Sequence, residues 1–245
     1  MTRAPAPTYR TYPSKEAAAE DMARATVDVL RAGIADRGSD AIALTGGSSP
    51  GPLYRALAEH HRGSLDWRAV DFFLGDERDV PHDHADSNMR TCAPILETVG
   101  ADPARLHPWR TDQRPEDALE AMRQVLAKAG LTHRGLDLCL LGVGEDGHVA
   151  SLFPEHEPWR LLGRTDRADD VAYVADSPKP PAGRYTFTLP FINRSRYVFL
   201  MPFGEDKRDA VAGFRQNDDA LPVRYVRGVE GTVVWTDLEV GKLGE

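Results

Sequence analysis

The chain of 245 residues contains little cysteine: Cys92 and Cys139 are the only two, and neither belongs to a C-x-x-C pair. Two isolated cysteines exclude the disulfide framework on which many small secreted domains depend. Cys139 stands in an apolar run that is typical of a buried strand. We therefore expect both thiols to be reduced, as in a cytoplasmic protein.

Long apolar runs and basic charge are also scarce. No stretch approaches the roughly 20 apolar residues that cross a bilayer, and the N-terminal segment MTRAPAPTYRTYPSKEAAAE lacks the apolar core of a secretory signal. Lys and Arg number 30 against 38 Asp and Glu, which gives a net charge of −8. This balance argues against nucleic acid or an anionic membrane as a partner, although a local cluster of cations can still hold a small anionic substrate. The oligomeric state is left open, with a monomer as the simpler expectation.

The sequence does contain a regular alternation of apolar runs and amphipathic segments, with 41% hydrophobic residues. Helices are expected from Ser14 to about Arg37, from residue 50 to about 61, from about Ser87 with an interruption near Pro94, and from Pro115 to Gly130. Strands are expected at residues 41–45, 70–74, 137–141, 171–175, 184–189, 196–201 and 231–236. This order predicts one Rossmann-like α/β domain over residues 1–245, with a mostly parallel central sheet covered by helices on both faces.

The most informative segment is LLGVGEDGHVASLFP, residues 140–154. An apolar strand ends there in glycines and is followed by Asp146 and His148. Open α/β sheets bind ligands beyond the carboxyl ends of their strands, and histidine exchanges protons near neutral pH. We expect His148 to act as a general base, with Asp146 either orienting the imidazole or binding a substrate hydroxyl. Taken alone, the DGH tripeptide favours a glycine-rich loop that carries a surface histidine, and the three other segments reverse this preference.

A second segment, TGGSSP at residues 45–50, follows the first predicted strand. Gly46, Gly47 and Ser48 form a turn, Ser49 is the expected N-cap, and Pro50 fits the first position of the next helix. The free N–H groups of such a helix start can hold a phosphate without a basic side chain. An ordinary capped turn is the alternative.

The third segment, GDERDVPHDHADSN at residues 75–88, places polar side chains directly after a strand. Asp76, Arg78 and Asn88 are candidates for contacts with substrate hydroxyls and phosphate, because a guanidinium donates two parallel hydrogen bonds to a phosphate. His82 and His84 have no second group of ligands at a recognisable spacing, so we expect no metal site.

The fourth segment runs from residue 177 to 207 and contains SPKPPAGRYTFTLPFIN. Its prolines stiffen an extended loop that presents Lys179 and then Arg184, and Lys207 follows a later glycine. Each cation is a candidate ligand of the phosphate, and a solvated surface charge is the alternative for each.

These four segments, in this order, resemble the family of the 6-phosphogluconolactonases and glucosamine-6-phosphate deaminases. The resemblance implies the fold of that family and hydrolysis of 6-phospho-D-glucono-1,5-lactone in the oxidative pentose phosphate pathway, with no metal and no organic cofactor. Gly51 stands where the family frequently has a lysine, so one possible cation near the phosphate is absent.

Two alternatives differ from the lactonase. A deaminase of the same family usually has an acidic residue and a tyrosine where this chain has Glu77 and Arg78, and an F-N-E-P stretch after the histidine, where this chain has SLFP at residues 151–154. A sugar-phosphate sensor needs an attached DNA-binding region, and only about a dozen residues precede the first predicted helix.

Overall fold

The computed structural model describes residues 5–154, 156, 159 and 169–239. Its main sheet has six strands in the order β1-β9-β8-β5-β2-β3, and every neighbouring pair is parallel. The strands are β1 (Thr8–Thr11), β2 (Asp40–Leu44), β3 (Val70–Leu74), β5 (Leu138–Gly142), β8 (Tyr197–Met201) and β9 (Gly231–Thr236). The central strands β2 and β5 are buried along nearly their whole length, as continuous apolar runs in a covered parallel sheet require.

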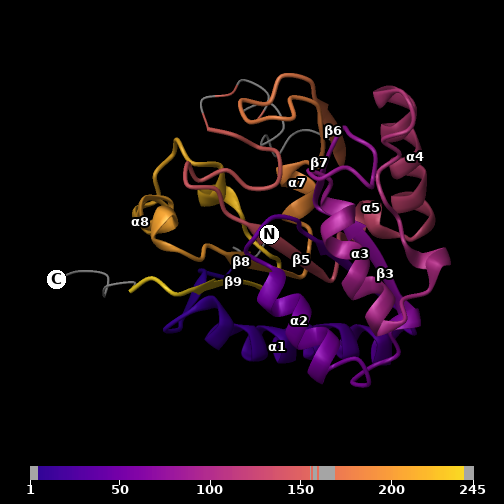
Figure 1. The fold of residues 1–245 in the computed structure, drawn as a ribbon, viewed down its shortest axis with the longest axis horizontal. Helices are drawn as coiled ribbons and strands as arrows, with labels where there is room; N and C mark the ends of the chain where they lie inside the picture. The colour runs from indigo at the N-terminus through magenta and orange to yellow at the C-terminus, as the bar shows by residue number, and fades with distance from the viewer. Residues whose placement is uncertain (1–4, 155, 157–158, 160–168, 240–245) are drawn as a thin grey trace.

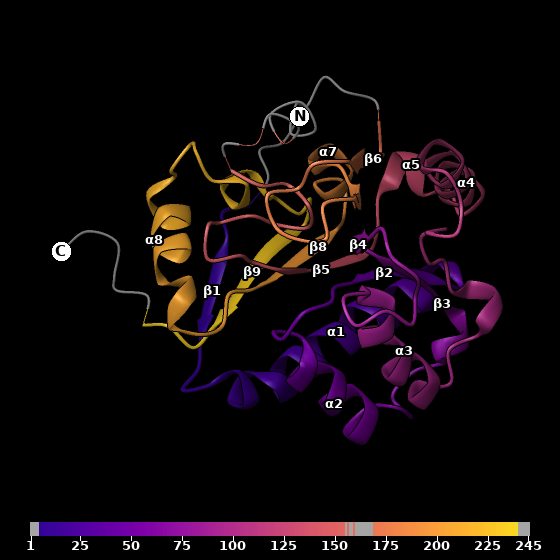
Figure 2. The ribbon, with the colours of Figure 1, turned by 45° about the horizontal axis from the view of Figure 1, so that its top comes forward.

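Helices cover both faces of this sheet, as predicted. Helices α1 (Lys15–Arg37) and α2 (Gly51–His60) pack against each other on one side, with α3 (Asn88–Val99) beside α2. Figure 1 shows α1 and α2 beneath the strands. On the other side lie α4 (Pro115–Lys128), α5 (Leu131–Arg134) and α7 (Leu189–Ile192), while α8 (Arg208–Gln216) lies beside the edge strand β1, where Phe214 contacts Tyr9 (Figure 2).

A second, smaller sheet was not predicted as such. It consists of β4 (Asp76–Arg78), β7 (Arg184–Phe187) and β6 (Val171–Val174), all antiparallel, with β7 in the middle. Strand β4 is formed by part of the segment that we expected to be a polar loop. It pairs Arg78 with Arg184 and Asp76 with Thr186, so the small sheet brings the third and fourth segments together.

The helix ends follow the expected capping rules in part. Ser14 caps α1 by accepting a hydrogen bond from the N–H of Ala17, and Gly38 ends it in the left-handed region. Ser87 caps α3, which continues through Pro94, so the predicted interruption is wrong. The prediction of Ser49 as N-cap is also wrong: Pro50 takes that position, without a side-chain cap.

A charged cluster lies at the amino ends of β2 and β5, at the opposite end of these strands from the loops described below. The side chains of Asp40 and Asp137 are fully buried, and Arg37 donates to both carboxylates, at 3.1 and 2.5 Å. Arg134 and Arg196 also pair with Asp137, at 2.7 and 3.5 Å. Burial, together with the neighbouring Asp137 carboxylate, raises the pKa of Asp40 to about 8.

Strand β1 forms one edge of the main sheet and pairs only with β9. Trp235 of β9 is fully buried. The ring of Tyr12, just after β1, stacks on it with centroids 6.0 Å apart, and the guanidinium of Arg10 lies 4.8 Å from its centroid. These contacts stabilise the packing of β1 against β9.

Candidate active site

The loops after β2 and β5 meet because these strands are parallel neighbours in the sheet, with Ala43 in register with Cys139. Between them lies a cleft of about 180 Å³. Its lining comes from all four of the sequence segments: Thr45, Gly46, Gly47, Ser48, Ser49, Asp76, Arg78, Asn88, Gly142, Val143, Gly144, His148, Ala150, Arg184 and Lys207. Ten of the twelve candidate residues line it; Asp146 and Lys179 do not.

Asp146 and His148 nevertheless form a pair beside the cleft. The carboxylate Oδ1 of Asp146 lies 2.5 Å from the imidazole Nδ1 of His148, and it also accepts a hydrogen bond from the backbone N–H of His148 at 3.2 Å. Because Asp146 occupies Nδ1, Nε2 is the ring nitrogen that remains for a ligand or a water molecule. The imidazole ring packs on the buried ring of Phe153, with centroids 4.6 Å apart and an interplanar angle of 34°.

The turn that carries this pair depends on Gly144. A Cβ at Gly144 would overlap both the imidazole of His148 and the carboxylate of Asp146. The N–H of Gly144 donates to the carbonyl of His148 at 2.9 Å, and the N–H of Gly147 donates to the carbonyl of Gly144 at 3.0 Å. These two N–H groups are therefore engaged within the turn. The glycine-rich sequence of the turn also suggests that backbone N–H groups between Gly142 and Gly147 stabilise an oxyanion, and this role would fall to N–H groups of the turn other than these two.

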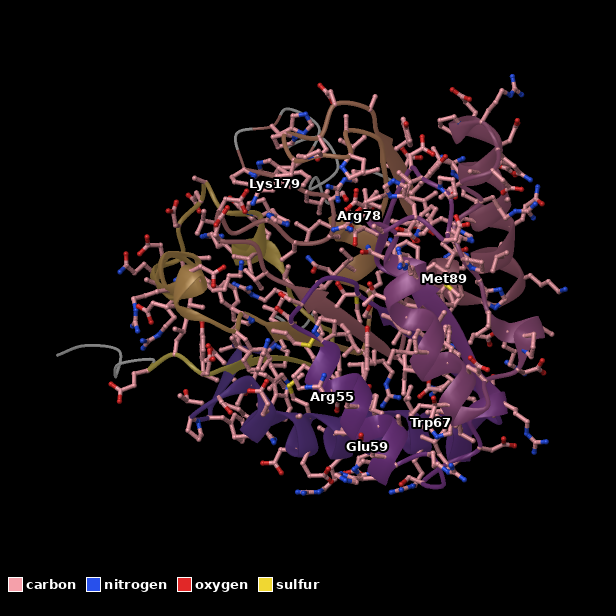
Figure 3. The ribbon with its side chains drawn as sticks, viewed as in Figure 1. Arg55, Glu59, Trp67, Arg78, Met89 and Lys179 are labelled. Atoms are coloured by element: carbon pink, nitrogen blue, oxygen red, sulfur yellow. The ribbon has the colours of Figure 1, made fainter. Side chains whose placement is uncertain are left out.

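Lys179 does not line the cleft but contacts the same turn from outside. Its ammonium lies 3.2 Å from Glu145 Oε1 and 3.5 Å from Asp146 Oδ2. Burial alone would raise the pKa of Asp146, but the hydrogen bond and charge of His148 and the charge of Lys179 lower it well below its usual range. Asp146 is thus an anion at working pH. In Figure 3, Lys179 and Arg78 lie in the upper part of the view, and Arg55 and Glu59 of α2 lie in the lower part.

Asp76 and Asn88 form a buried network at the floor of the cleft. The amide of Asn88 donates to the backbone carbonyl and to Oδ1 of Asp76, at 2.9 and 3.0 Å, and the hydroxyl of Ser151 donates to Asp76 Oδ2 at 2.7 Å. The Oδ1 atom of Asn88 is buried and has no partner in the described part of the chain. A Cβ at Gly46 would collide with this amide, which explains the glycine there.

Glu77, which sequence reasoning did not select, anchors the start of α3. Its side chain is fully buried and accepts four hydrogen bonds. The donors are the N–H groups of Arg78, Asn88 and Met89, at 2.7, 2.7 and 2.8 Å, and the hydroxyl of Ser87, at 3.0 Å. A carboxylate at a helix N-terminus is favourable. It fixes the backbone of both Arg78 and Asn88.

Three cations line the cleft, with different surroundings. Arg78 Nη1 donates to the carbonyl of Asp86, while its buried Nε has no partner among the described residues. Arg184 is 4% exposed, and its Nε and Nη2 donate to the carbonyls of residues 179, 180 and 181 at 2.8–3.1 Å. Lys207 pairs with the adjacent Asp206 at 2.8 Å. Arg184 therefore holds the proline loop and also faces the cleft.

A larger cavity of about 640 Å³ lies between α4 and the segment around Pro108. Its walls are mostly apolar, and its two histidines are already engaged. His82 Nε2 lies 2.8 Å from the carbonyl of Trp109, and His107 Nε2 lies 2.8 Å from Asp71 Oδ1. In the described part of the chain, the lining of this cavity is thus mainly apolar and both of its histidines are engaged at Nε2, whereas polar groups from four segments line the smaller cleft.

Two further findings concern metals and membranes. Within residues 5–154, 156, 159 and 169–239, the His, Cys, Asp and Glu side chains form no group of three or more that could bind a metal ion. In the same residues, we find no helix with the length and apolar character needed for a membrane span.

Comparison with known families agrees with the geometry. Residues 13–235 match the family model described as glucosamine-6-phosphate isomerases/6-phosphogluconolactonase. The chain belongs to this family. The resemblance noted in the sequence is thereby confirmed.

Individual relatives point to the same group. The chain is 38% identical to the 6-phosphogluconolactonase of Streptomyces coelicolor over 218 residues, which cover 84% of this chain and 82% of the relative. It is 37% identical to that of Synechocystis over 211 residues, covering 82% and 83%. A rice relative described as probable and chloroplastic is 33% identical, covering 91% of this chain and 72% of the relative.

Solved structures support the fold. The 6-phosphogluconolactonase of Thermotoga maritima superposes with a TM-score of 0.81 at 27% identity, covering 94% of this chain and 99% of that one. The enzyme from Trypanosoma brucei gives 0.80 at 28% identity, covering 94% and 95%. The predicted α/β class with a parallel sheet and flanking helices is therefore confirmed.

Proposed function

We propose that this chain hydrolyses 6-phospho-D-glucono-1,5-lactone to 6-phosphogluconate, the lactonase step of the oxidative pentose phosphate pathway. The observation that carries the proposal is the Asp146–His148 pair, whose Nδ1···Oδ1 distance is 2.5 Å, at a cleft that also contains a helix start and three cations. The activity named for the relatives of highest quoted identity agrees with it.

The reaction needs a base, and His148 supplies it. Nε2 accepts a proton from a water molecule as the water oxygen attacks the lactone carbonyl. The tetrahedral intermediate then collapses, the bond from the carbonyl carbon to the ring oxygen breaks, and the imidazolium returns the proton to that oxygen. The carboxylate of Asp146 holds the ring by Nδ1 and stabilises the transient positive charge.

Substrate binding is assigned to the rest of the cleft. The phosphate lies against the loop of Gly46 to Ser49 at the start of α2, with Arg78, Arg184 and Lys207 around it. Asp76 and Asn88, which line the same cleft, accept hydrogen bonds from sugar hydroxyls. Binding of the remote phosphate then orients the carbonyl toward His148.

Lys179 acts indirectly in this scheme, because it contacts Glu145 and Asp146 rather than the cleft. No cofactor takes part in the proposed steps. The acting unit is a single domain over residues 1–245, and a monomer is sufficient because all the proposed groups come from one chain.

The decisive experiment compares two substrates. Proton release near pH 7 after adding freshly prepared 6-phosphogluconolactone is measured against ammonia release from glucosamine 6-phosphate. Lactone-dependent proton release above the spontaneous rate, without ammonia, supports the proposal. Ammonia release would instead identify a deaminase, and tight sugar-phosphate binding without either reaction would identify a sensor.

A further inference from the structure

Tyr54, in the first turn of α2, contacts both ends of the phosphate loop. Its phenol donates a hydrogen bond to the carbonyl of Thr45 at 2.7 Å and accepts one from the N–H of Thr45 at 3.1 Å. Its own N–H donates to the carbonyl of Pro50 at 2.9 Å. The bond to Pro50 is the first helical bond of α2, which any residue but proline makes at this position, so the contact particular to Tyr54 is that of its phenol with Thr45.

The phenol hydroxyl satisfies both backbone groups of Thr45, its N–H and its carbonyl, as the backbone of a neighbouring strand would. The preceding residue, Leu44, ends β2 and still pairs with the N–H of Gly75 at 2.9 Å. Tyr54 is 6% exposed, and Cys92 of α3 packs its Sγ 3.8 Å from the phenol oxygen and 3.6 Å from the carbonyl of Thr45. Burial raises the pKa of Tyr54 well above its usual value, so the hydroxyl keeps its proton and remains a donor.

We propose that Tyr54 is a positioning residue for the substrate phosphate: the two hydrogen bonds of its phenol hold Thr45, the first residue of the 45–50 loop, against the start of α2 so that the intervening N–H groups converge on the anion. Between the two ends, Gly46 to Ser49 are the residues that reach solvent and line the cleft. N–H groups bind an anion well only when they are aligned before it arrives. The proposal rests on the lactonase function above and deepens it.

The test is Tyr54→Phe, which keeps the ring and removes the hydroxyl. Tyr12→Phe is the matched control, because it likewise removes a hydrogen-bonded tyrosine hydroxyl, which donates to Asp21 at 2.9 Å, but Tyr12 does not line the cleft. For each protein we would measure kcat and KM with phosphorylated and unphosphorylated gluconolactone, and the Kd of 6-phosphogluconate. Loss of aligned hydrogen bonds is expected to weaken 6-phosphogluconate binding roughly tenfold in Tyr54→Phe.

The expected pattern is selective. In Tyr54→Phe, KM for the phosphorylated lactone rises while kcat/KM for the unphosphorylated lactone stays within about twofold of wild type. Amide exchange in the peptide that contains Thr45 to Ser49 becomes faster. Tyr12→Phe changes none of these readouts.

Equal losses with both lactones, or unchanged phosphate selectivity, would overturn the proposal, because a merely structural role affects both substrates alike. If Tyr54→Phe does not fold, Cys92→Ala takes its place, because it removes the thiol packed on the phenol. It should raise KM for the phosphorylated lactone by a smaller factor and again leave kcat/KM for the unphosphorylated lactone unchanged. Unchanged selectivity there overturns the proposal too. A wild-type protein without lactonase activity refutes the proposed function separately, and phosphate binding and amide exchange then still report on the loop.

Discussion

Replacement of Asp146 by Asn tests whether the aspartate supports the base or binds substrate. The 2.5 Å contact between Asp146 Oδ1 and His148 Nδ1 favours the first role. Asparagine keeps the shape of the side chain but removes the charge that stabilises the imidazolium. A hydrogen bond to a charged group contributes about 1.5–3 kcal/mol, and about 1.4 kcal/mol corresponds to a tenfold change in rate.

We therefore expect kcat of Asp146→Asn to fall by about tenfold to 150-fold. The side chain of Asp146 is 30% exposed, so solvent screening places the effect in the lower part of that range. KM and the Kd of 6-phosphogluconate should change by less than about threefold, since the interaction is used mainly in the transition state. Kinetics by proton release and product binding by calorimetry provide both numbers.

The double mutant Asp146→Asn/His148→Ala should be little slower than His148→Ala alone, because two residues that act as one unit are not additive. Asp117→Asn is the control, since Asp117 pairs with Arg114 on the exposed surface of α4 and should leave kcat unchanged. Full additivity in the cycle, or a raised KM at unchanged kcat, would refute the role in catalysis and assign Asp146 to substrate binding.

Four further predictions follow from the same geometry. His148→Ala should lower kcat roughly a hundredfold to ten-thousandfold with little change in product Kd, and near wild-type turnover of the folded variant would exclude it as the base. Gly144→Ala should abolish most activity because its Cβ overlaps the imidazole, and retained kcat would contradict the turn geometry. Arg184→Lys should lose most of the preference for the phosphorylated over the unphosphorylated lactone, measured as the ratio of kcat/KM, since an ammonium lacks the planar fork that lets Arg184 donate to the loop carbonyls from Nε and Nη2 while it faces the cleft; an unchanged ratio counts against this. The folded state raises the pKa of Asp40 from 3.8 to about 8, so the protonated carboxyl stabilises the fold at low pH, and this contribution to the free energy of unfolding is lost as the pH rises toward about 8. Asp40→Asn should remove this contribution to the pH dependence of the urea midpoint between about pH 5 and 9, and an unchanged pH dependence would disprove it.

Much of the main sheet could be predicted because its strands are continuous apolar runs, such as residues 137–141, that end in glycines or polar residues. One strand of the main sheet, β1, and one of the smaller sheet, β4, could not be predicted. The sequence TYRT of β1 is polar and forms an edge strand only because β9 lies beside it, and Asp-Glu-Arg of β4 extends because it pairs with β7. Helix α8 was missed as well, since its short amphipathic stretch carries no strong start signal.

The candidate site was predictable as a set of segments, because the carboxyl ends of neighbouring parallel strands converge. Individual contacts were not. The hydroxyl of Ser151 reaches Asp76 across 75 residues, and no local pattern reveals such a pair. Lys179 pairs with Glu145 outside the cleft. The sequence of the loop alone does not indicate that this acidic side chain lies within reach of the lysine.

The pairing of β1 with β9 has a consequence for synthesis of the chain on the ribosome. Residues Thr8–Thr11 leave the ribosome well before Gly231–Thr236, their strand partner among the described residues, which is made more than two hundred residues later. At roughly 5–20 residues per second, β1 waits on the order of ten seconds or more with its backbone groups unpaired. The polar sequence TYRT, with Arg10 in its middle, suits that interval, because a charged, short strand is a poor template for association with other nascent chains.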